Sequence, residues 1–435
     1  MDRRRFLAAS ATLAAAKGLP ALAEPLAPEH RTEHPKLPAS IAALGSMKER
    51  ATPISPDERR ARVEQARRLM TAEKLDALVL TPGTSLDYFA GIRWHGGERL
   101  FACVVPRQGE PFFVCPYFEE DRAREQIAAG PFAGKAADLR TWQEDESPFD
   151  LVAAGLRDRG AATGTVGIDE TAKFVFSDGI AAAAPRATLV SGTPVTAGCR
   201  MIKDAHELAL MRLANQATWE VYRAVYRSLE PGMTQDRVGA LIRIAYARVG
   251  FSGDATIQTG EYTALPHGSL TPQVIREGTI LMVDDGCTVE GYQSDITRTF
   301  VLGKATDDMK RVFEIVRRAQ NAGLAAARPG APLASIDAAA RKVIVDAGYG
   351  PGFKYFTHRL GHGIGMDGHE WPYLVENDMF GWRRSLVAAP GMCFSDEPGI
   401  YLRGAFGIRL EDDMTITADG AELFTTQSES LEKPF

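Results

Sequence analysis

Two stretches of this chain repeat one pattern, and the repetition limits the folds that the chain can adopt. Residues 231–250 and 329–348 each begin with Pro-Gly and close with a glycine 19 residues after the proline. Three inner positions also correspond: Val238 with Ile336, Ala240 with Ala338, and Arg243 with Arg341. A Pro-Gly turn before each stretch and a glycine at its end predict two equivalent helices.

Each predicted helix is followed by an equivalent strand that leads to a carboxylate. "GTILMVD" (278–284) and "GMCFSDE" (391–397) both place an acid six residues after a glycine. Two matches in the same order indicate an internal duplication. Because duplicated halves pack around an approximate twofold axis, we expect Asp284 and Glu397 to meet in one central crevice. The sequence thus predicts an α+β domain over 193–435 with an internal pseudo-twofold duplication.

The preceding residues, 56–192, alternate helical and strand signals. The predicted helices cover 57–75 and 118–130, the predicted strands cover 76–82 and 164–170, and a hairpin over 100–116 turns at 107–109. This pattern predicts an α/β domain without a catalytic constellation of its own. His95 lies on a predicted loop, and we interpret it as a solvated or substrate-rim residue.

The first residues are typical of a targeting segment. Residues 1–23 combine three arginines, an uncharged Ala/Leu stretch and an Ala-Leu-Ala end, as in a twin-arginine signal peptide. The apolar stretch is much shorter than the roughly 20 residues that a membrane-spanning helix needs. Residues 24–55 are punctuated by proline and predict a linker or a surface arm. We therefore expect cleavage after Ala23 and a periplasmic protein.

Composition disfavours several classes of partner and site. A formal net charge of -6 and a pI near 5.9 argue against nucleic acid and against an anionic membrane surface. The five cysteines include no C-x-x-C pair, so there is no zinc-ribbon or dithiol redox motif. A single disulfide between Cys103 and Cys115 stays open as an alternative in an exported protein.

Five polar residues of the duplicated domain stand within predicted apolar strands or, for His362, in a predicted glycine-rich loop: Asp284, Asp295, His362, Glu397 and Glu411. An unpaired ionised carboxylate is costly in such surroundings, and four of them in one crevice repel one another unless cations separate them. Four carboxylates and one imidazole suit two divalent ions, manganese ahead of cobalt, iron or zinc. Two adjacent ions would lower the pKa of a bridging water and hold hydroxide near neutral pH, which predicts metal-assisted hydrolysis.

The motifs around these residues resemble those of the pita-bread metallopeptidases, in the branch of Xaa-Pro aminopeptidases and prolidases. "ALPHG", "DDGCTVEGYQSDITRTF", "HRLGHGIGMDGHE", "DEPGIY" and "GIRLEDD" occur in this order. "RMIKDAHELALMRLANQAT" (200–218) resembles the family's entry helix, and residues 56–192 resemble its creatinase-type N-terminal domain. The resemblance covers the whole mature chain and implies the pita-bread fold for residues 193–435.

The resemblance also implies a role for each metal ligand. Asp284 would be a terminal ligand of one ion, and His362 and Glu397 would complete the other. Asp295 and Glu411 would bridge both ions. Glu397 would in addition relay a proton from the bridging water.

Four further residues match the family's substrate-facing groups. His267, His358 and His369 would orient the substrate and stabilise the tetrahedral intermediate, and Arg409 would support the site. For Arg409, a structural ion pair with Asp412 or Asp413 is the competing interpretation. The glycines at 361, 363 and 365 would let the backbone approach the metal and the substrate.

By resemblance, the chain cleaves the bond between an N-terminal residue and proline in small peptides, as a dipeptidase or an aminopeptidase, and relatives often form homodimers. Such a bond lacks an N–H group, so a site that activates the carbonyl suits it.

Three alternative functions stay open. The first is metal-free creatinase chemistry, which is disfavoured because the ligand positions are retained. The second is non-peptide chemistry, which would include dimethylsulfoniopropionate lysis and ectoine or organophosphate hydrolysis. The third is a non-catalytic binding module, which would normally lose its ligands.

Two features depart from the family pattern. Asp285 and Asp396 are extra acids beside Asp284 and Glu397, and they could lie on the opposite faces of their strands or alter the choice of metal. Residues 371–385 lengthen the segment between His362 and Glu397, and we expect this segment to form part of the specificity wall.

Overall fold

The six-stranded sheet of the N-terminal domain has the order β4-β3-β2-β1-β5-β6. The computed structural model that shows it describes residues 37–133, 137–376 and 386–435, so the predicted signal peptide lies outside the described residues. The strands are β1 (Ala77–Leu80), β2 (Ala102–Pro106), β3 (Phe112–Pro116), β4 (Asp138–Trp142), β5 (Thr165–Ile168) and β6 (Thr188–Ser191). The helices are α2 (Pro56–Ala72), α3 (Thr84–Ala90), α4 (Glu120–Ala129), α5 (Pro148–Asp158), α6 (Phe174–Ala183) and α7 (Thr193–Arg200).

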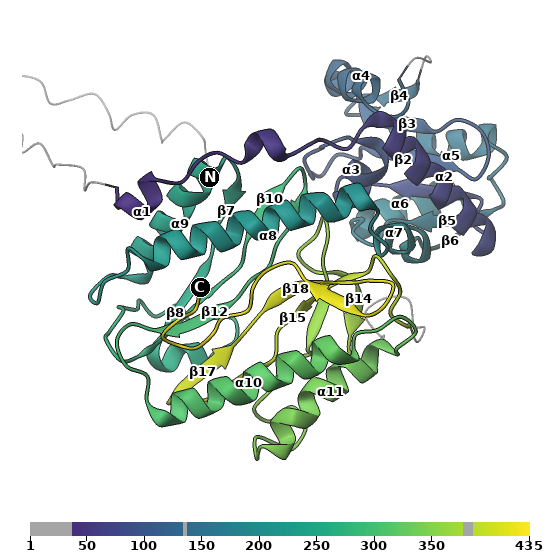
Figure 1. The fold of residues 1–435 in the computed structure, drawn as a ribbon. Coiled ribbons are helices and arrows are strands. Elements are labelled where there is room, and N and C mark those ends of the chain that lie inside the picture. The colour runs from purple at the N-terminus through teal and green to yellow at the C-terminus, as the bar shows by residue number, and fades with distance from the viewer. Residues whose placement is uncertain (1–36, 134–136, 377–385) are drawn as a thin grey trace, which may run out of the picture. The chain divides into compact units, whose positions relative to one another are not determined.

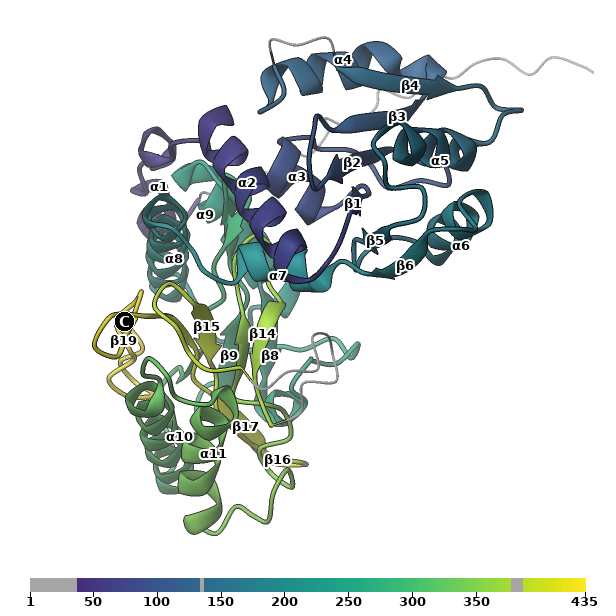
Figure 2. The same ribbon diagram turned by 90° about the vertical axis from the view of Figure 1, so that its right-hand side faces the viewer.

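Helices α5 and α6 cover one face of this sheet, as Figure 2 shows. Val152 and Leu156 of α5 and Ile180 of α6 are fully buried, and they share one apolar core with side chains of the central strands. Strands β2 and β3 pair antiparallel, which confirms the predicted hairpin, and β1 pairs parallel with β5. Sequence periodicity located these elements because strands buried on both faces are continuous apolar runs.

The described part of the predicted linker lies against the duplicated C-terminal domain, which the resemblance predicts to be the catalytic domain. It contains α1 (Ala39–Ala42) and a short 3₁₀ turn over Lys48–Arg50. Ser40 donates a hydrogen bond to the Ala224 carbonyl at 2.7 Å, and the Met47 N–H donates to the Val249 carbonyl at 2.8 Å. Residues 38–50 therefore form an arm along the catalytic domain.

The catalytic domain contains two helix pairs and several short sheets. Its helices are α8 (Ala205–Tyr226), α9 (Gln235–Val249), α10 (Asp307–Ala326) and α11 (Leu333–Asp346). The strands of its first half are β7 (Ser252–Gly253), β8 (Thr256–Thr259), β9 (Ile280–Asp284), β10 (Cys287–Val289), β11 (Tyr292–Gln293) and β12 (Arg298–Val301). Those of its second half are β13 (Gly361–Gly363), β14 (Glu370–Leu374), β15 (Cys393–Asp396), β16 (Gly399–Leu402), β17 (Phe406–Arg409), β18 (Asp412–Ile416) and β19 (Ala421–Leu423).

The two halves repeat one arrangement, as the sequence predicts. The predicted helices are α9 and α11, and each packs against the helix before it, α8 or α10 (Figure 1). The predicted strands are β9 and β15. β9 pairs antiparallel with β8 and β12, while β15 pairs antiparallel with β13 and β18. Each half thus places its acid-bearing strand in the middle of a small antiparallel sheet.

None of the five cysteines, which all lie in the described residues, forms a disulfide. Cys103 lies opposite Phe113 rather than Cys115 in the β2–β3 ladder, and all five cysteines are buried free thiols. The disulfide alternative is therefore wrong. No helix within residues 37–133, 137–376 and 386–435 combines the length and the apolar character needed to cross a membrane.

Candidate metal centre

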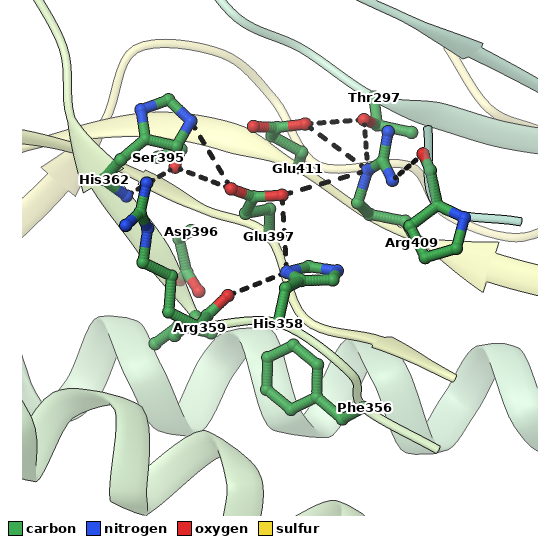
Figure 3. A network of polar contacts seen from close by, with 12 residues as sticks. Thr297, Phe356, His358, Arg359, His362, Ser395, Asp396, Glu397, Arg409 and Glu411 are labelled. Atoms are coloured by element: carbon green, nitrogen blue, oxygen red, sulfur yellow. Dashed lines mark hydrogen bonds and ion pairs between the residues drawn. The ribbon is translucent and has the colours of Figure 1, made fainter. Parts of the chain in front are cut away.

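One pocket of about 420 Å³ in the catalytic domain gathers all the predicted metal ligands and the four predicted supporting residues. Its lining includes the five predicted ligands Asp284, Asp295, His362, Glu397 and Glu411, and the four predicted supporting residues His267, His358, His369 and Arg409. His95 of the N-terminal domain is exposed and is not among the lining residues. Residues far apart in the sequence thus converge on one site (Figure 3).

The duplicated strands deliver two of the acids to this pocket. Asp284 is the last residue of β9, and Glu397 directly follows β15. Asp295 lies in the short link between β11 and β12, and Glu411 lies in the link between β17 and β18. His362, which we expected in a loop, is instead the central residue of strand β13.

The glycines around His362 are required by close packing within the protein. A Cβ atom at Gly361 would lie 1.9 Å from the Ser395 carbonyl oxygen, and one at Gly363 would lie 2.3 Å from the Glu370 carbonyl oxygen. At Gly365 it would lie 2.3 Å from a carboxylate oxygen of Glu370. Among the described residues, these glycines leave room for neighbouring protein groups where a side chain would otherwise lie.

The imidazole of His362 presents a lone pair to the carboxylates. Its Nδ1–H donates to the Gly363 carbonyl at 3.1 Å, which leaves Nε2 as the acceptor nitrogen. Nε2 lies 3.4 Å from Glu397 Oε1 and 3.7 Å from Asp295 Oδ2. Burial holds the pKa of His362 well below its ordinary value, so the ring is neutral. A neutral imidazole fixed by a hydrogen bond from its other nitrogen is the usual form of a metal-binding histidine.

The carboxylates are arranged in two overlapping groups. Donor atoms of His362, Glu397 and Glu411 lie within 4.8 Å of one another, and so do those of Asp284, Asp295 and Glu411. Glu411 belongs to both groups, as a bridging ligand would. A third group joins Asp295 and His362 to His369, so the geometry also allows His369 as a ligand.

The electrostatics of the protein alone are unfavourable for ionised carboxylates. Burial and neighbouring acids raise the pKa values of Asp295 and Glu411 well above the ordinary range, and burial raises the pKa of Glu397 to about 7. These groups cannot all carry a negative charge unless cations lie among them. The donor set therefore fits two divalent ions, because ions would supply the missing positive charge.

Arg409 and Thr297 hold the acids in place. The Arg409 guanidinium forms an ion pair with Asp284 and donates to the Thr297 hydroxyl at 3.0 Å. Thr297 Oγ1 lies 2.5 Å from Asp284. It also lies 2.6 Å from Glu411 (Figure 3). The competing interpretation of Arg409 is wrong, since Asp412 pairs with Arg298 instead.

Asp413, the other proposed partner of Arg409, accepts hydrogen bonds from the Asn215 side chain and from the Asp295 N–H, each at 2.9 Å. Like Thr297, the hydroxyls of Ser395 and Tyr401 were not predicted. Ser395 Oγ lies 3.3 Å from Glu397, and Tyr401 donates to His358 Nε2 at 2.7 Å. Single hydroxyls have no distinctive spacing in a sequence. The one signal for their role was that Thr297 and Ser395 each lie two residues from a predicted metal ligand.

The predicted histidines line different sides of the pocket. His358 Nδ1 donates to the Arg359 carbonyl at 2.8 Å and lies 3.8 Å from Glu397 Oε2. Burial, together with the nearby Arg409 charge, lowers the pKa of His358 to about 3, so this ring is also neutral. The ring of His369 is stacked on that of His362, while His267 lines the pocket beside Pro266.

Neither extra acid, Asp285 or Asp396, is among the residues that line the pocket. Asp396 is fully buried, and its carboxyl group lies against helix α10 at Gly323, whereas Glu397 lines the pocket and accepts a hydrogen bond from Ser395. Burial, and then the neighbouring Asp412, raise the pKa of Asp396 well above its ordinary range. Of the predicted specificity wall, Val375 lines the pocket, and residues 377–385 lie outside the described residues.

Comparison with known proteins agrees with this geometry. A family model described as "Metallopeptidase family M24" matches residues 209–418, and one described as "Creatinase/Prolidase N-terminal domain" matches residues 62–202. A relative from Mycobacterium tuberculosis named "Probable dipeptidase PepE" is 37% identical over 351 residues, which are 80% of this chain and 89% of that protein. The Xaa-Pro dipeptidase of Lactobacillus delbrueckii subsp. lactis is 31% identical over 363 residues, which are 82% of this chain and 94% of that protein.

Solved structures show the same relationship. The crystal structure of dipeptidase PepE from Mycobacterium ulcerans matches with a TM-score of 0.80 and 32% sequence identity, over 88% of this chain and 99% of that one. All three relatives are named as dipeptidases, which does not favour the non-peptide alternatives. The chain is a peptidase of the metallopeptidase family M24 and carries the creatinase/prolidase N-terminal domain of that family.

Proposed function

We propose that the protein hydrolyses the peptide bond between an N-terminal residue and proline, with two divalent ions held by Asp284, Asp295, His362, Glu397 and Glu411. Members of family M24 are dinuclear-metal enzymes. The observation that carries the proposal is the sharing of Glu411 between two groups of donor atoms in one pocket that also contains three other histidines.

The ions would supply Lewis-acid polarisation of the scissile carbonyl and an activated water. The protein supplies the proton transfer. Glu397 accepts the proton that the attacking water loses and delivers it to the proline nitrogen as the C–N bond breaks.

The pocket walls suit a proline residue. Phe353 and Val375 are apolar lining residues, and the neutral rings of His358 and His369 line the same pocket. Since the Xaa-Pro bond has no N–H to donate, recognition depends on the carbonyl and on the shape of the ring. Arg409 keeps the donors of both halves in register through Asp284 and Thr297.

Peptide hydrolysis tests this proposal directly. Metal-loaded protein should release the N-terminal alanine from Ala-Pro or from Ala-Pro-Ala, and Glu411→Gln should abolish the release while the protein stays folded. Which of the two peptides is cleaved separates dipeptidase from aminopeptidase activity. Cleavage of neither peptide, with two metal equivalents bound, would contradict the proposal.

We propose manganese as the native metal, because four of the five donors are carboxylates and a hard oxygen-rich set suits it. Mass spectrometry of protein purified without added metal would measure the content. We expect near two equivalents of manganese per chain, and zinc in its place would refute the assignment.

We also propose that the enzyme is an exported homodimer. The support for export is the arginine-rich, apolar start of the chain, and the support for the dimer is the resemblance to dimeric relatives. Cell fractionation should find the protein in the periplasm, and a variant with Arg4 and Arg5 changed to lysine should stay in the cytoplasm. Light scattering should give twice the chain mass.

A further inference from the structure

A buried ion cluster lies directly beside the metal centre and is not used by the proposed chemistry. Lys203 Nζ lies 2.7 Å from Glu370 Oε1, and the Arg200 guanidinium contacts both Glu370 and Asp367. The side chains of Arg200, Lys203 and Glu370 are between 1% and 5% exposed. Burying such charges carries a large desolvation cost. A gain in stability alone therefore does not explain why these charged side chains are buried here.

The two acids of the cluster bracket His369. Asp367 precedes it by two residues and Glu370 follows it directly. The same turn is held from β11, where the Gln293 side chain donates to the Met366 carbonyl at 2.9 Å and the Gln293 N–H donates to the Gly365 carbonyl at 2.8 Å. The backbone of this turn is therefore fixed at both ends.

The cations come from outside the catalytic sheets. Arg200 is the last residue of α7, and Lys203 lies in the link before α8. The hydroxyl of Thr84, at the start of α3 in the N-terminal domain, donates to Asp367. The position of the His369 turn consequently depends on residues that precede the catalytic helices.

The position of the His369 turn matters for the site because His369 stacks on the predicted metal ligand His362. Its ring lies 3.7 Å from that of His362 and 14° from parallel to it, and its Nδ1 lies 3.2 Å from the Arg359 guanidinium. A shift of the turn would slide His369 across the face of a metal-binding imidazole. Small displacements of this kind affect a reaction that depends on orientation.

We propose that Arg200 and Lys203 are positioning residues for His369, which they hold against His362 by fixing Asp367 and Glu370 on either side of it. The inference rests on the proposed peptidase function for its kinetic consequence. The alternative is a purely structural role, in which the cluster joins the two domains without any effect on the histidine.

Arg200→Lys tests the proposal, because lysine keeps the charge but cannot contact both acids. In metal-free protein, the imidazole NMR resonance of His369, assigned with His369→Gln, should shift in Arg200→Lys. Arg212→Lys is the matched control, since Arg212 belongs to α8 and pairs with Glu422 at the surface. An unchanged His369 resonance in Arg200→Lys would overturn the proposal.

Kinetics with metal-loaded enzyme and Ala-Pro supply the second readout. Arg200→Lys should lower kcat/KM by about 10- to 100-fold with both metals retained. In the His369→Gln background the same change should have an effect of less than about twofold, because both changes act through one ring. Fully additive losses would show a structural role and overturn the proposal.

Misfolding of the variant and failure of the proposed function can both be distinguished from failure of this proposal. If Arg200→Lys does not fold, Thr84→Val carries both measurements with the buried charges intact, and the same resonance shift and non-additivity are expected. If the wild-type enzyme cleaves no Xaa-Pro peptide, the proposed function fails, while the NMR comparison in metal-free protein still decides whether the cluster positions His369.

Discussion

The guanidinium of Arg409 forms an ion pair with Asp284, 125 residues away in the sequence, and so joins the two halves of the catalytic domain at the metal centre. Lysine has one ammonium group and cannot reach Asp284, Thr297 and the Pro266 carbonyl together. We expect Arg409→Lys to lower kcat/KM for Ala-Pro by roughly 100-fold. Arg328→Lys, at an exposed site, should leave it unchanged; equal activity of both variants would contradict this role.

The Thr297 hydroxyl should control metal affinity. It lies within hydrogen-bonding distance of Asp284 and Glu411, so its loss frees two ligands to rotate. Thr297→Val should weaken metal binding by about 10- to 100-fold, as measured by titration with manganese. Thr297→Ser keeps the hydroxyl and serves as the control. Wild-type affinity in Thr297→Val would show that the contact is incidental.

Metal removal should destabilise the protein more at high pH than at low pH. In the metal-free fold, burial raises the pKa of Glu397 from 4.5 to about 7, so the folded state binds this proton more tightly than the unfolded chain. Stability is therefore lost as the pH rises from about 4.5 through 7, by at most about 3 kcal/mol for this group.

Thermal unfolding with and without chelator measures the effect. The difference in Tm between metal-loaded and stripped protein should be larger at pH 8 than at pH 5.5, because bound cations offset the charge that appears above neutrality. A difference that is the same at both pH values would count against the electrostatic account of the site.

Close packing at Gly361 should make this position intolerant of any side chain. An added Cβ would lie 1.9 Å from the Ser395 carbonyl oxygen, so β13 and β15 must separate. Gly361→Ala should lower the free energy of unfolding by about 1–3 kcal/mol and reduce metal occupancy, because β13 carries His362. Gly420→Ala, with open space around it, is the control. Urea unfolding and metal analysis would check both.

A histidine away from the site should add a pH-dependent contribution to stability. His206 Nδ1 donates to Glu58 at 2.6 Å and its Nε2 donates to the Thr52 carbonyl at 3.0 Å, so both ring nitrogens carry protons. Burial opposes the charge, yet the hydrogen bonds to Glu58 and Thr52 raise the pKa of His206 above 6.5. Burial is likewise outweighed at Glu58, where hydrogen bonds from Ser55 and His206 lower the pKa to about 2.

The sign of the effect follows from these two shifts. The contribution of His206 to the free energy of unfolding is complete below pH 6.5 and is lost as the pH rises through its raised pKa. The contribution of Glu58 is complete above pH 4.5 and is lost as the pH falls toward 2. His206→Gln should thus destabilise most between pH 4.5 and 6.5, by less than about 1 kcal/mol at this partly exposed site. Urea unfolding at pH 5.5 and pH 9 would measure it, with His95→Gln as the control.

Much of the site could be predicted because its ligands sit at positions with a strong pattern. Asp284 and Glu397 occupy equivalent strand ends of a visible duplication, and the spacing of the motifs identified Asp295 and Glu411. His362 was assigned to a loop because three glycines surround it, whereas the glycines are there so that a strand can pack without side chains.

The supporting residues could not be predicted in the same way. The hydroxyl of Thr297 and the carboxylate of Glu370 act through contacts that bridge more than 100 residues of sequence. No local spacing reports such a contact, and only the folded chain reveals it. For the same reason, the sequence left an ion pair of Arg409 with Asp412 or Asp413 open as a competing interpretation, although Arg298 binds Asp412 and Asn215 binds Asp413.

The equivalence of β9 and β15 has a historical consequence. Each of these strands brings its own acid to the centre, and each half alone offers only part of the donor set. An ancestral gene encoding one half could have assembled a comparable cavity only by self-association of two copies. Fusion of those copies would then have allowed the two sides to diverge, so that one now contributes an imidazole and the other does not.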